Sequence, residues 1–207
     1  MGRTPDYMNM KFASFAATHV DWAGTDRTNE HGEQNLLNFQ KHLRRDDVSL
    51  THTIIQPNND KRTDGQTIGN TVTLHKVGET PDSIIVRGAR ILGTLAPFAD
   101  EIAVYPAMPL PDGAEDYALS FSIPMDIPGL KFLCRDSASS PANAFDRPLS
   151  SRFDEQDSFV IFDHVEIPRS LVFIDGAPGT VDIQQGRTQR PVEQHDHPNH
   201  HSCAQQT

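Results

Sequence analysis

The sequence is poor in cysteine and in basic residues, and it lacks long apolar runs. Cys134 and Cys203 alone cannot build a disulfide framework or a thiolate metal cluster. The 18 Lys and Arg face 28 Asp and Glu, and the net charge of −10 argues against nucleic acid or an anionic membrane as partner. No apolar run reaches the ~18–20 residues of a membrane span, and the first residues lack the charged-then-apolar layout of a signal peptide. We therefore expect a soluble, cytoplasmic protein with no nucleic-acid or membrane partner.

The 207 residues fit one ordinary domain with ragged ends. Leu36, Phe39 and Leu43 recur at spacings of three and four, which predicts an amphipathic helix over Asn35–Arg45. The weakly apolar segment Met8–Ala17 is a second helix candidate.

From Leu50 onward the pattern becomes typical of short strands bounded by Pro, Gly, Asp or Ser. The expected strands are 71–74, 83–87, 101–105, 117–123, 130–135 and 158–162, with a turn over 77–82. Regular short strands of this kind indicate an antiparallel sandwich or barrel.

After Phe173 the apolar periodicity ends, and residues 176–207 are rich in Gln, His, Pro and Gly. Such a segment buries too little apolar surface to offset its ordering entropy, so we expect it to be disordered. Its histidines and Cys203 match no closed metal site, and we expect adventitious metal binding at most. Nucleophile-elbow, phosphate-loop, dinucleotide and zinc-protease motifs are all missing from the sequence.

Spacing alone offers few chemical candidates. Arg3 and Tyr7 are four residues apart and share a face if their segment is helical, although a solvated N-terminus is the more common case. His52 lies between the expected helix and an irregular stretch, where a structural histidine is the more common case. The stretch 57–62 is rich in turn formers and donors, although an ordinary exposed loop is the more common case.

Five collinear stretches over positions 2–174 carry a more specific signal. They are GRTPDYMN (2–9), LTHTIIQP (50–57), VRGARI (86–91), YALSF (117–121) and PLSSRFDEQD (148–157), which continues to Arg169. Together they resemble the oxygenase component of two-component, flavin-dependent aromatic hydroxylases, the 4-hydroxyphenylacetate 3-monooxygenase family.

The resemblance implies an α+β fold like that of the acyl-CoA dehydrogenases, with N-terminal helices, a middle antiparallel β-barrel and a C-terminal helical bundle. The matching stretches assign residues 1–50 to a remnant of the N-terminal helices and 51–174 to the middle β domain. Residues 175–207 resemble no part of the family, and no C-terminal bundle is expected in this chain.

The implied activity is hydroxylation of a phenol, such as 4-hydroxyphenylacetate, at the carbon next to its hydroxyl group. In the family, reduced FAD (FADH2) and molecular oxygen form a C4a-hydroperoxide whose distal oxygen is transferred. A separate flavin reductase supplies the reduced FAD, and full-length members are homo-oligomers.

By resemblance, Arg3, Tyr7 and His52 surround the phenol oxygen and act in both catalysis and substrate binding. The residues expected to contact the flavin are Asn58, Asn59, Asp60, Lys61 and Thr94. Pro106 and Ala107 are expected to line the substrate pocket.

The chain departs from its relatives in three places. Asn58 and Lys61 replace the Gln and Arg of many relatives, and Ala107 replaces a serine that meets the polar tail of the substrate. The interval from Tyr7 to His52 is also longer than in close relatives. A related dehydratase branch needs an iron–sulfur cluster, which two cysteines cannot supply.

A second hypothesis stays open, in which the chain is a non-catalytic fragment that docks onto full-length relatives. An incomplete flavin site binds weakly, since affinity depends on enclosure. This hypothesis predicts an exposed apolar face that favours association.

Overall fold

The computed structural model describes residues 5–24, 27–57, 69–107, 110–111, 113–137, 145–149, 151 and 156–177. Within these residues two α-helices precede the strands, α1 (Pro5–Ala17) and α2 (Glu30–Asp46). The amphipathic helix predicted from sequence is confirmed, because Leu36, Phe39 and Leu43 are all buried. Both helices start earlier than predicted, α1 at Pro5 rather than Met8 and α2 at Glu30 rather than Asn35.

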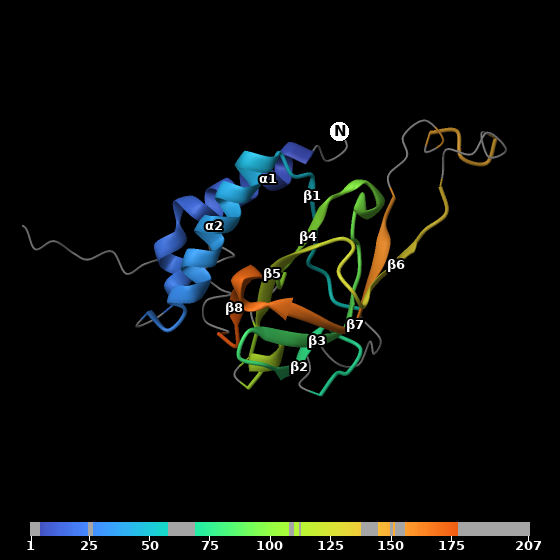
Figure 1. The fold of residues 1–207 in the computed structure, drawn as a ribbon. Coiled ribbons are helices and arrows are strands. Elements are labelled where there is room, and N and C mark those ends of the chain that lie inside the picture. Colours follow the sequence, from blue (N-terminus) through green and yellow to red (C-terminus); the bar gives the residue numbers. More distant parts are fainter. Residues whose placement is uncertain are drawn as a thin grey trace, which may run out of the picture.

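Eight strands in the described part of the chain form two four-stranded sheets (Figure 1). They are β1 (Leu50–Thr53), β2 (His75–Glu79), β3 (Ser83–Arg90), β4 (Glu101–Val104), β5 (Leu119–Pro124), β6 (Leu130–Cys134), β7 (Ser158–Pro168) and β8 (Val172–Asp175). The first sheet has the order β1-β4-β5-β8 and the second the order β2-β3-β7-β6. Neighbouring strands are antiparallel, except that β1 runs parallel to β4.

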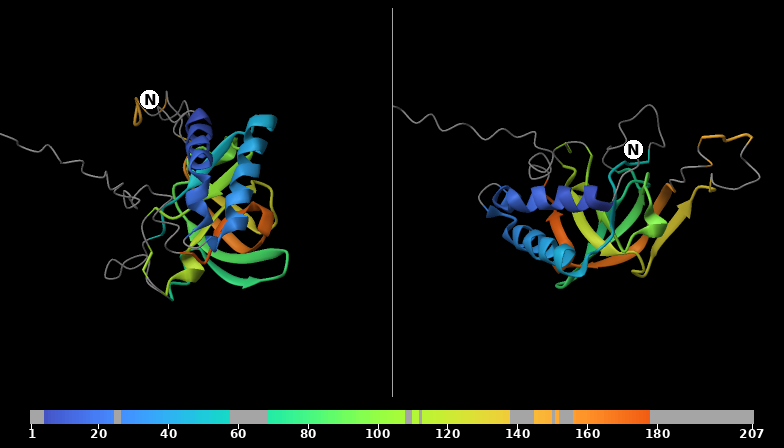
Figure 2. Two further views of the ribbon diagram at one scale, coloured as in Figure 1. Left: turned by 90° about the vertical axis from the view of Figure 1, so that its left-hand side faces the viewer. Right: turned by 90° about the horizontal axis from the view of Figure 1, so that it is seen from above.

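The helices and the sheets make three layers. Figures 1 and 2 both show α1 and α2 side by side on one flank of the strands. Side chains of β4 alternate between two cores: Ile102 and Val104 face the second sheet, whereas Ala103 faces the helices. The first sheet is therefore covered on both faces, which explains why its strands are buried almost throughout. The α+β fold class expected from the resemblance is confirmed.

Aromatic rings hold the helix layer onto the first sheet. Phe12 of α1 packs edge-on against Phe39 of α2, with ring centroids 5.0 Å apart, and against Phe173 of β8 at 5.9 Å. Phe39 and Phe173 lie 5.3 Å apart, so the three rings close a triangle between two helices and a strand. The helices thus share one core with the first sheet, and the expected division at residues 50 and 174 stays a prediction.

Strands β1 and β8 were not predicted. The strand expected over 71–74 is found a few residues further along the chain. The chain forms its regular strand at His75–Glu79, and Thr73 makes only an isolated bridge to Ala89. Beside this bridge β3 has a bulge at Gly88, whose φ is 122°, and a Cβ built at Gly88 would lie 2.4 Å from the Thr73 carbonyl oxygen.

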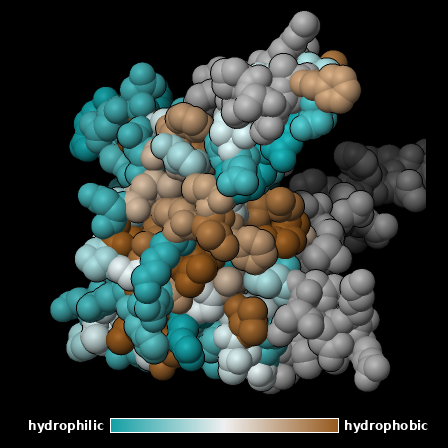
Figure 3. All heavy atoms as spheres, turned by 90° about the vertical axis from the view of Figure 1, so that its right-hand side faces the viewer, coloured by the Kyte–Doolittle hydropathy of each residue, from teal (hydrophilic) through white to brown (hydrophobic). Residues whose placement is uncertain are grey.

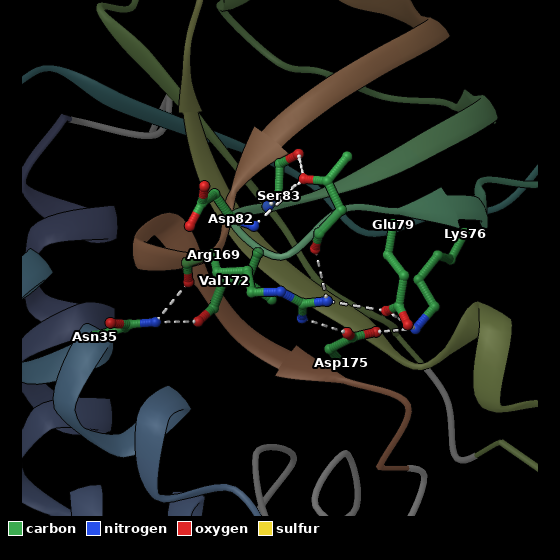
Figure 4. Close-up of polar contacts among 9 residues, drawn as sticks. Asn35, Lys76, Glu79, Asp82, Ser83, Arg169, Val172 and Asp175 are labelled. Atoms are coloured by element: carbon green, nitrogen blue, oxygen red, sulfur yellow. Dashed lines mark hydrogen bonds and ion pairs between the residues drawn. The ribbon is translucent and has the colours of Figure 1, made fainter.

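A polar network joins α2, the β2–β3 hairpin and β8 (Figure 4). Asn35 donates to the carbonyls of Arg169 and Val172, at 2.7 and 2.8 Å. The Arg169 guanidinium lies between Glu79 and Asp175, with contacts of 3.0 and 3.3 Å. This network links one end of the second sheet to the helix layer.

The outer face of the second sheet carries exposed apolar side chains. Figure 3 shows apolar atoms gathered in the middle of the face on the β6 and β7 side. Leu133 of β6 is 65% exposed, and Phe159 and Ile161 of β7 are 48% and 38% exposed. No described helix has the length and apolar character needed to cross a bilayer.

Candidate functional site

A small cavity lies where α1 meets β1 and the segment after β3. Its volume is about 90 Å³, and its walls are mainly apolar. Three residues expected at the site from sequence line it together, namely Tyr7, His52 and Thr94. They come from three separate elements, so the fold brings them to one place although 45 and 42 residues separate them in turn.

His52 is the buried member of this group. Its position in β1 places its imidazole against α1, where Nδ1 contacts the Met8 sulfur. The Tyr7 ring is 41% exposed and lies 6.3 Å from the His52 ring, at a tilt of 53°. The two side chains flank the cavity from different elements, which suits donors that meet one end of a bound ring.

Tyr105 closes the other side of His52. Their ring centroids are 5.7 Å apart, and the Lys11 ammonium lies 4.8 Å above the Tyr105 ring. Pro106 and Ala107 directly follow Tyr105 at the end of β4, but they do not line the cavity. The structure therefore leaves these two predicted substrate contacts outside the cavity that His52 lines.

Thr94 lies on a turn with unusual backbone geometry. Leu92 and Leu95, on either side of it, have φ values of 63° and 58°. These left-handed conformations are unfavourable for a leucine and cluster at functional sites in proteins. Leu95 itself lines the cavity, so the strained turn forms part of its wall.

Five predicted site residues lie outside the described residues: Arg3, Asn58, Asn59, Asp60 and Lys61. The histidines and the cysteine of the tail also lie outside them, at positions 195, 197, 200, 201 and 203.

The cavity also contains residues that the sequence did not suggest. Met8 and Thr51 are direct neighbours of the predicted Tyr7 and His52, and Phe98 completes an apolar wall. Asp157 accepts a hydrogen bond of 2.8 Å from the Thr94 hydroxyl across a sequence separation of 63 residues. No local pattern links Thr94 to Asp157, because the contact depends on the pairing of β3 with β7.

A buried cation lies next to the same strand. Arg90 ends β3, is fully buried, and donates from Nη1 to the Ile54 carbonyl at 3.4 Å. Among the described residues its Nε and Nη2 atoms have no hydrogen-bond partner, and burial lowers the pKa of Arg90 to about 10.

A second cavity, of about 490 Å³, lies at the polar network of Figure 4. Its charged side chains already neutralise one another, since Arg169 pairs with Glu79 and Asp175, and Lys76 pairs with Asp175 at 2.8 Å. It contains none of the predicted site residues. The first cavity is therefore the better candidate for chemistry.

Comparison with known proteins points to one family of aromatic hydroxylases. The family described as 4-hydroxyphenylacetate 3-hydroxylase N terminal matches residues 1–174. The 4-hydroxyphenylacetate 3-monooxygenase oxygenase component of Thermus thermophilus is 40% identical over 178 residues, covering 85% of this chain and 35% of the relative. The 4-nitrophenol 2-monooxygenase oxygenase component of a Rhodococcus species is 35% identical over 179 residues, covering 84% and 32%.

Solved structures with a similar fold point to the same family. The crystal structure of the oxygenase component (HpaB) of 4-hydroxyphenylacetate 3-monooxygenase, complexed with FAD, superposes with a TM-score of 0.77 at 34% identity. That match covers 90% of this chain and 37% of the solved one. An archaeal 4-hydroxybutyryl-CoA dehydratase has the same fold, with a TM-score of 0.72 at 18% identity, covering 84% of this chain and 35% of the other. The chain thus spans about a third of the length of the curated relatives that it matches.

Proposed function

The chain belongs to the 4-hydroxyphenylacetate 3-hydroxylase family, and from this premise we propose that its site serves a flavin-dependent phenol monooxygenase. In this proposal the site belongs to the oxygenase component of a two-component system, which inserts one oxygen atom of O2 next to a phenol hydroxyl. The observation that carries the proposal is the cavity that gathers Tyr7, His52 and Thr94.

The side chains of the cavity suit a phenol. Met8, Leu95 and Phe98 offer apolar walls to an aromatic ring, and the Tyr7 and His52 side chains offer hydrogen-bonding groups at one end. Donors held in place around a phenol oxygen stabilise the negative charge that develops on it, most strongly where water is excluded. His52 is also the residue suited to holding or moving a proton at that oxygen near neutral pH.

The dimensions of the cavity fit one ring rather than a whole cofactor. About 90 Å³ is small beside the roughly 300–1,000 Å³ of ligand pockets in general. Thr94 presents a polar atom beside apolar surface, which fits the polar edge of a flat, otherwise apolar ring system such as the flavin. When bound, reduced FAD supplies the activated oxygen, and in this proposal Thr94 and Asn58–Lys61 hold it.

A reconstituted assay tests the proposal. The chain is mixed with an NADH-dependent flavin reductase, FAD, O2 and either 4-hydroxyphenylacetate or 4-nitrophenol, and the catechol product is measured. His52→Ala should abolish product formation while the chain stays folded. The matched control is His31→Ala, an exposed position on α2 outside this cavity, which should keep the wild-type rate. Undiminished hydroxylation by His52→Ala would remove His52 from the chemistry.

The choice between the two substrates rests on Ala107. A position without a hydroxyl offers no hydrogen bond to the carboxylate tail of 4-hydroxyphenylacetate. We therefore propose that the chain favours a phenol whose binding needs no hydrogen bond to a carboxylate tail. The ratio of the two product yields measures this preference.

The second hypothesis, docking onto a full-length relative, draws support from the exposed apolar face of Leu133, Phe159 and Ile161 (Figure 3). Anaerobic titration with reduced FAD separates the two hypotheses. Micromolar binding, followed by a long-lived absorbing species after O2 addition, supports the oxygenase. Immediate flavin oxidation without binding, together with co-elution with a full-length relative, supports docking.

A further inference from the structure

Thr94 is fixed from three sides. The backbone N–H groups of its two neighbours, Gly93 and Leu95, donate to the carbonyls of Ser158 and Gln156, at 3.0 and 2.7 Å. From the other side, the Thr51 hydroxyl of β1 donates to the Thr94 carbonyl. The turn is thus clamped between β1 and the residues before and at the start of β7.

This clamp keeps the turn in a conformation that its residues do not favour. Leu92 and Leu95 both have left-handed backbones, with φ of 63° and 58°. A Cβ at Gly93 would lie 2.9 Å from a methyl group of Val160, so the turn also packs closely on β7. Strain retained by surrounding structure indicates that the presentation of Thr94 matters to the site.

The hydrogen bond to Asp157 gives the Thr94 hydroxyl a direction. A threonine hydroxyl has one proton to donate and two lone pairs that accept. An ionised carboxylate only accepts, so the 2.8 Å contact between Thr94 Oγ1 and Asp157 Oδ1 uses the single proton of the hydroxyl. Only the lone pairs of Oγ1 then remain for a ligand in the cavity that Thr94 lines.

We propose that Asp157 is a positioning residue that makes Thr94 a hydrogen-bond acceptor toward the cavity, so that the ligand presents a donor there. The inference rests on the proposed function, within which a ring N–H of the flavin supplies this donor. A neutral phenol O–H has the same chemistry, and the test distinguishes the two sources. A ligand carbonyl or phenolate oxygen at this point is disfavoured, because two acceptors would face each other.

The test uses four single variants of the full chain and the double variant Thr94→Val with Asp157→Ala. Thr94→Val keeps the side-chain shape without the hydroxyl, and Thr94→Ser keeps the hydroxyl as the matched control. Asp157→Ala frees the hydroxyl to rotate, and Asp157→Asn keeps an acceptor oxygen in the same place. Each variant is titrated anaerobically with oxidised FAD, with reduced FAD and with 4-hydroxyphenylacetate alone, and its unfolding temperature is measured.

We expect Thr94→Val and Asp157→Ala each to weaken binding about three- to tenfold, the usual range for one hydrogen bond. The double variant should lose no more than either single one, because both changes remove the same interaction. Thr94→Ser should bind like wild type, and Asp157→Asn should recover most of the affinity. If Asp157 only stabilised the fold, the losses of affinity in the two single variants would add up in the double variant, and Asp157→Asn would not recover the affinity.

The pattern across ligands identifies the donor. A loss confined to reduced FAD assigns an N–H that only the reduced ring carries, and an equal loss for both redox forms assigns an N–H common to both. A loss confined to the phenol assigns its O–H. Wild-type affinity in Thr94→Val, or full additivity in the double variant, overturns the inference. Failure of the wild-type chain to bind either flavin form or the phenol refutes the proposed function itself.

Discussion

Gly32 gives the sharpest test of how the helix layer is held. Replacing a helical glycine by alanine usually stabilises a protein, but at Gly32 we expect it to destabilise the fold. In an exposed helix interior, Gly→Ala stabilises by about 1 kcal/mol. Here a Cβ at Gly32 would lie 2.0 Å from the Phe173 carbonyl oxygen and 2.4 Å from the Asn29 side-chain nitrogen. Neither neighbour can yield freely, since Asn29 Nδ2 donates to Trp22 O at 2.8 Å and to Phe173 O at 2.7 Å.

The size of the effect follows from these contacts. Forcing α2 away from β8 costs about 1–3 kcal/mol by overpacking. The two Asn29 hydrogen bonds add about 1 kcal/mol each when they break, and the gain in helix propensity offsets about 1 kcal/mol. We therefore expect Gly32→Ala to lower the free energy of unfolding by about 2–4 kcal/mol. For a chain of this size the unfolding temperature falls by roughly 5–15 °C.

Urea unfolding measures this directly. Trp22 is the single tryptophan of the chain and is buried in the helix layer, 5.0 Å from the Phe15 ring, so its fluorescence follows undocking. Lys41→Ala, on the exposed side of α2, is the matched control and should change stability by less than about 0.5 kcal/mol. If Gly32→Ala proves as stable as wild type, the close approach of α2 to β8 is wrong.

Two further predictions concern charged side chains. A hydrogen bond from His42 to Glu101, at 2.7 Å, raises the pKa of His42 above its ordinary value, with Asp46 adding to the effect. Its stabilising contribution is complete below the unfolded-state value of about 6.5 and is lost as the pH rises through the higher folded-state pKa. Urea unfolding between about pH 6 and pH 9 should therefore show a decline that His42→Gln lacks, and equal slopes would contradict the pairing. Arg90→Met should raise the free energy of unfolding by about 1–3 kcal/mol, because it removes a buried charge that has a single weak hydrogen bond to the part of the chain that the structure describes. A decrease of similar size, measured by thermal unfolding, would mean that Arg90 has a counter-charge.

The apolar pattern predicted the elements that bury one face and expose the other. Leu36, Phe39 and Leu43 predicted α2 because a helix on a sheet buries one stripe. The same pattern missed the start of α2, since Asn29 before its first turn is held by a hydrogen bond to Trp22 and by one to Phe173, which is 144 residues away.

Strands β1 and β8 escaped prediction for a related reason. The four residues of β1, Leu50–Thr53, are buried on both faces, so they show no alternation. The short β8 contains the strand-favouring residues Val, Phe and Ile, but four residues are too few to show an alternation, and its pairing with β5 is visible only in the fold.

The chemistry of the site was accessible from sequence only through resemblance. Tyr7, His52 and Thr94 are unremarkable by spacing, and the fold alone makes them neighbours. Asp157 belongs to the stretch 148–157 that carries the resemblance, but its hydrogen bond to Thr94 joins two distant segments and is visible only in the fold.

The cavity lies on the boundary between two layers, and this position couples its geometry to the docking of the helices. Tyr7 and Met8 come from α1, whereas His52 and Thr94 belong to the sheet side. The wall from α1 stays in place only while α1 remains packed on the sheet, and the ring of Phe12 against Phe39 and Phe173 holds it there. A change that undocks the helices must therefore open the cavity even where it touches none of the lining residues. Weakened ligand binding by a distant helix variant is thus evidence about docking, and only variants that keep the unfolding temperature report on the chemistry of the site itself.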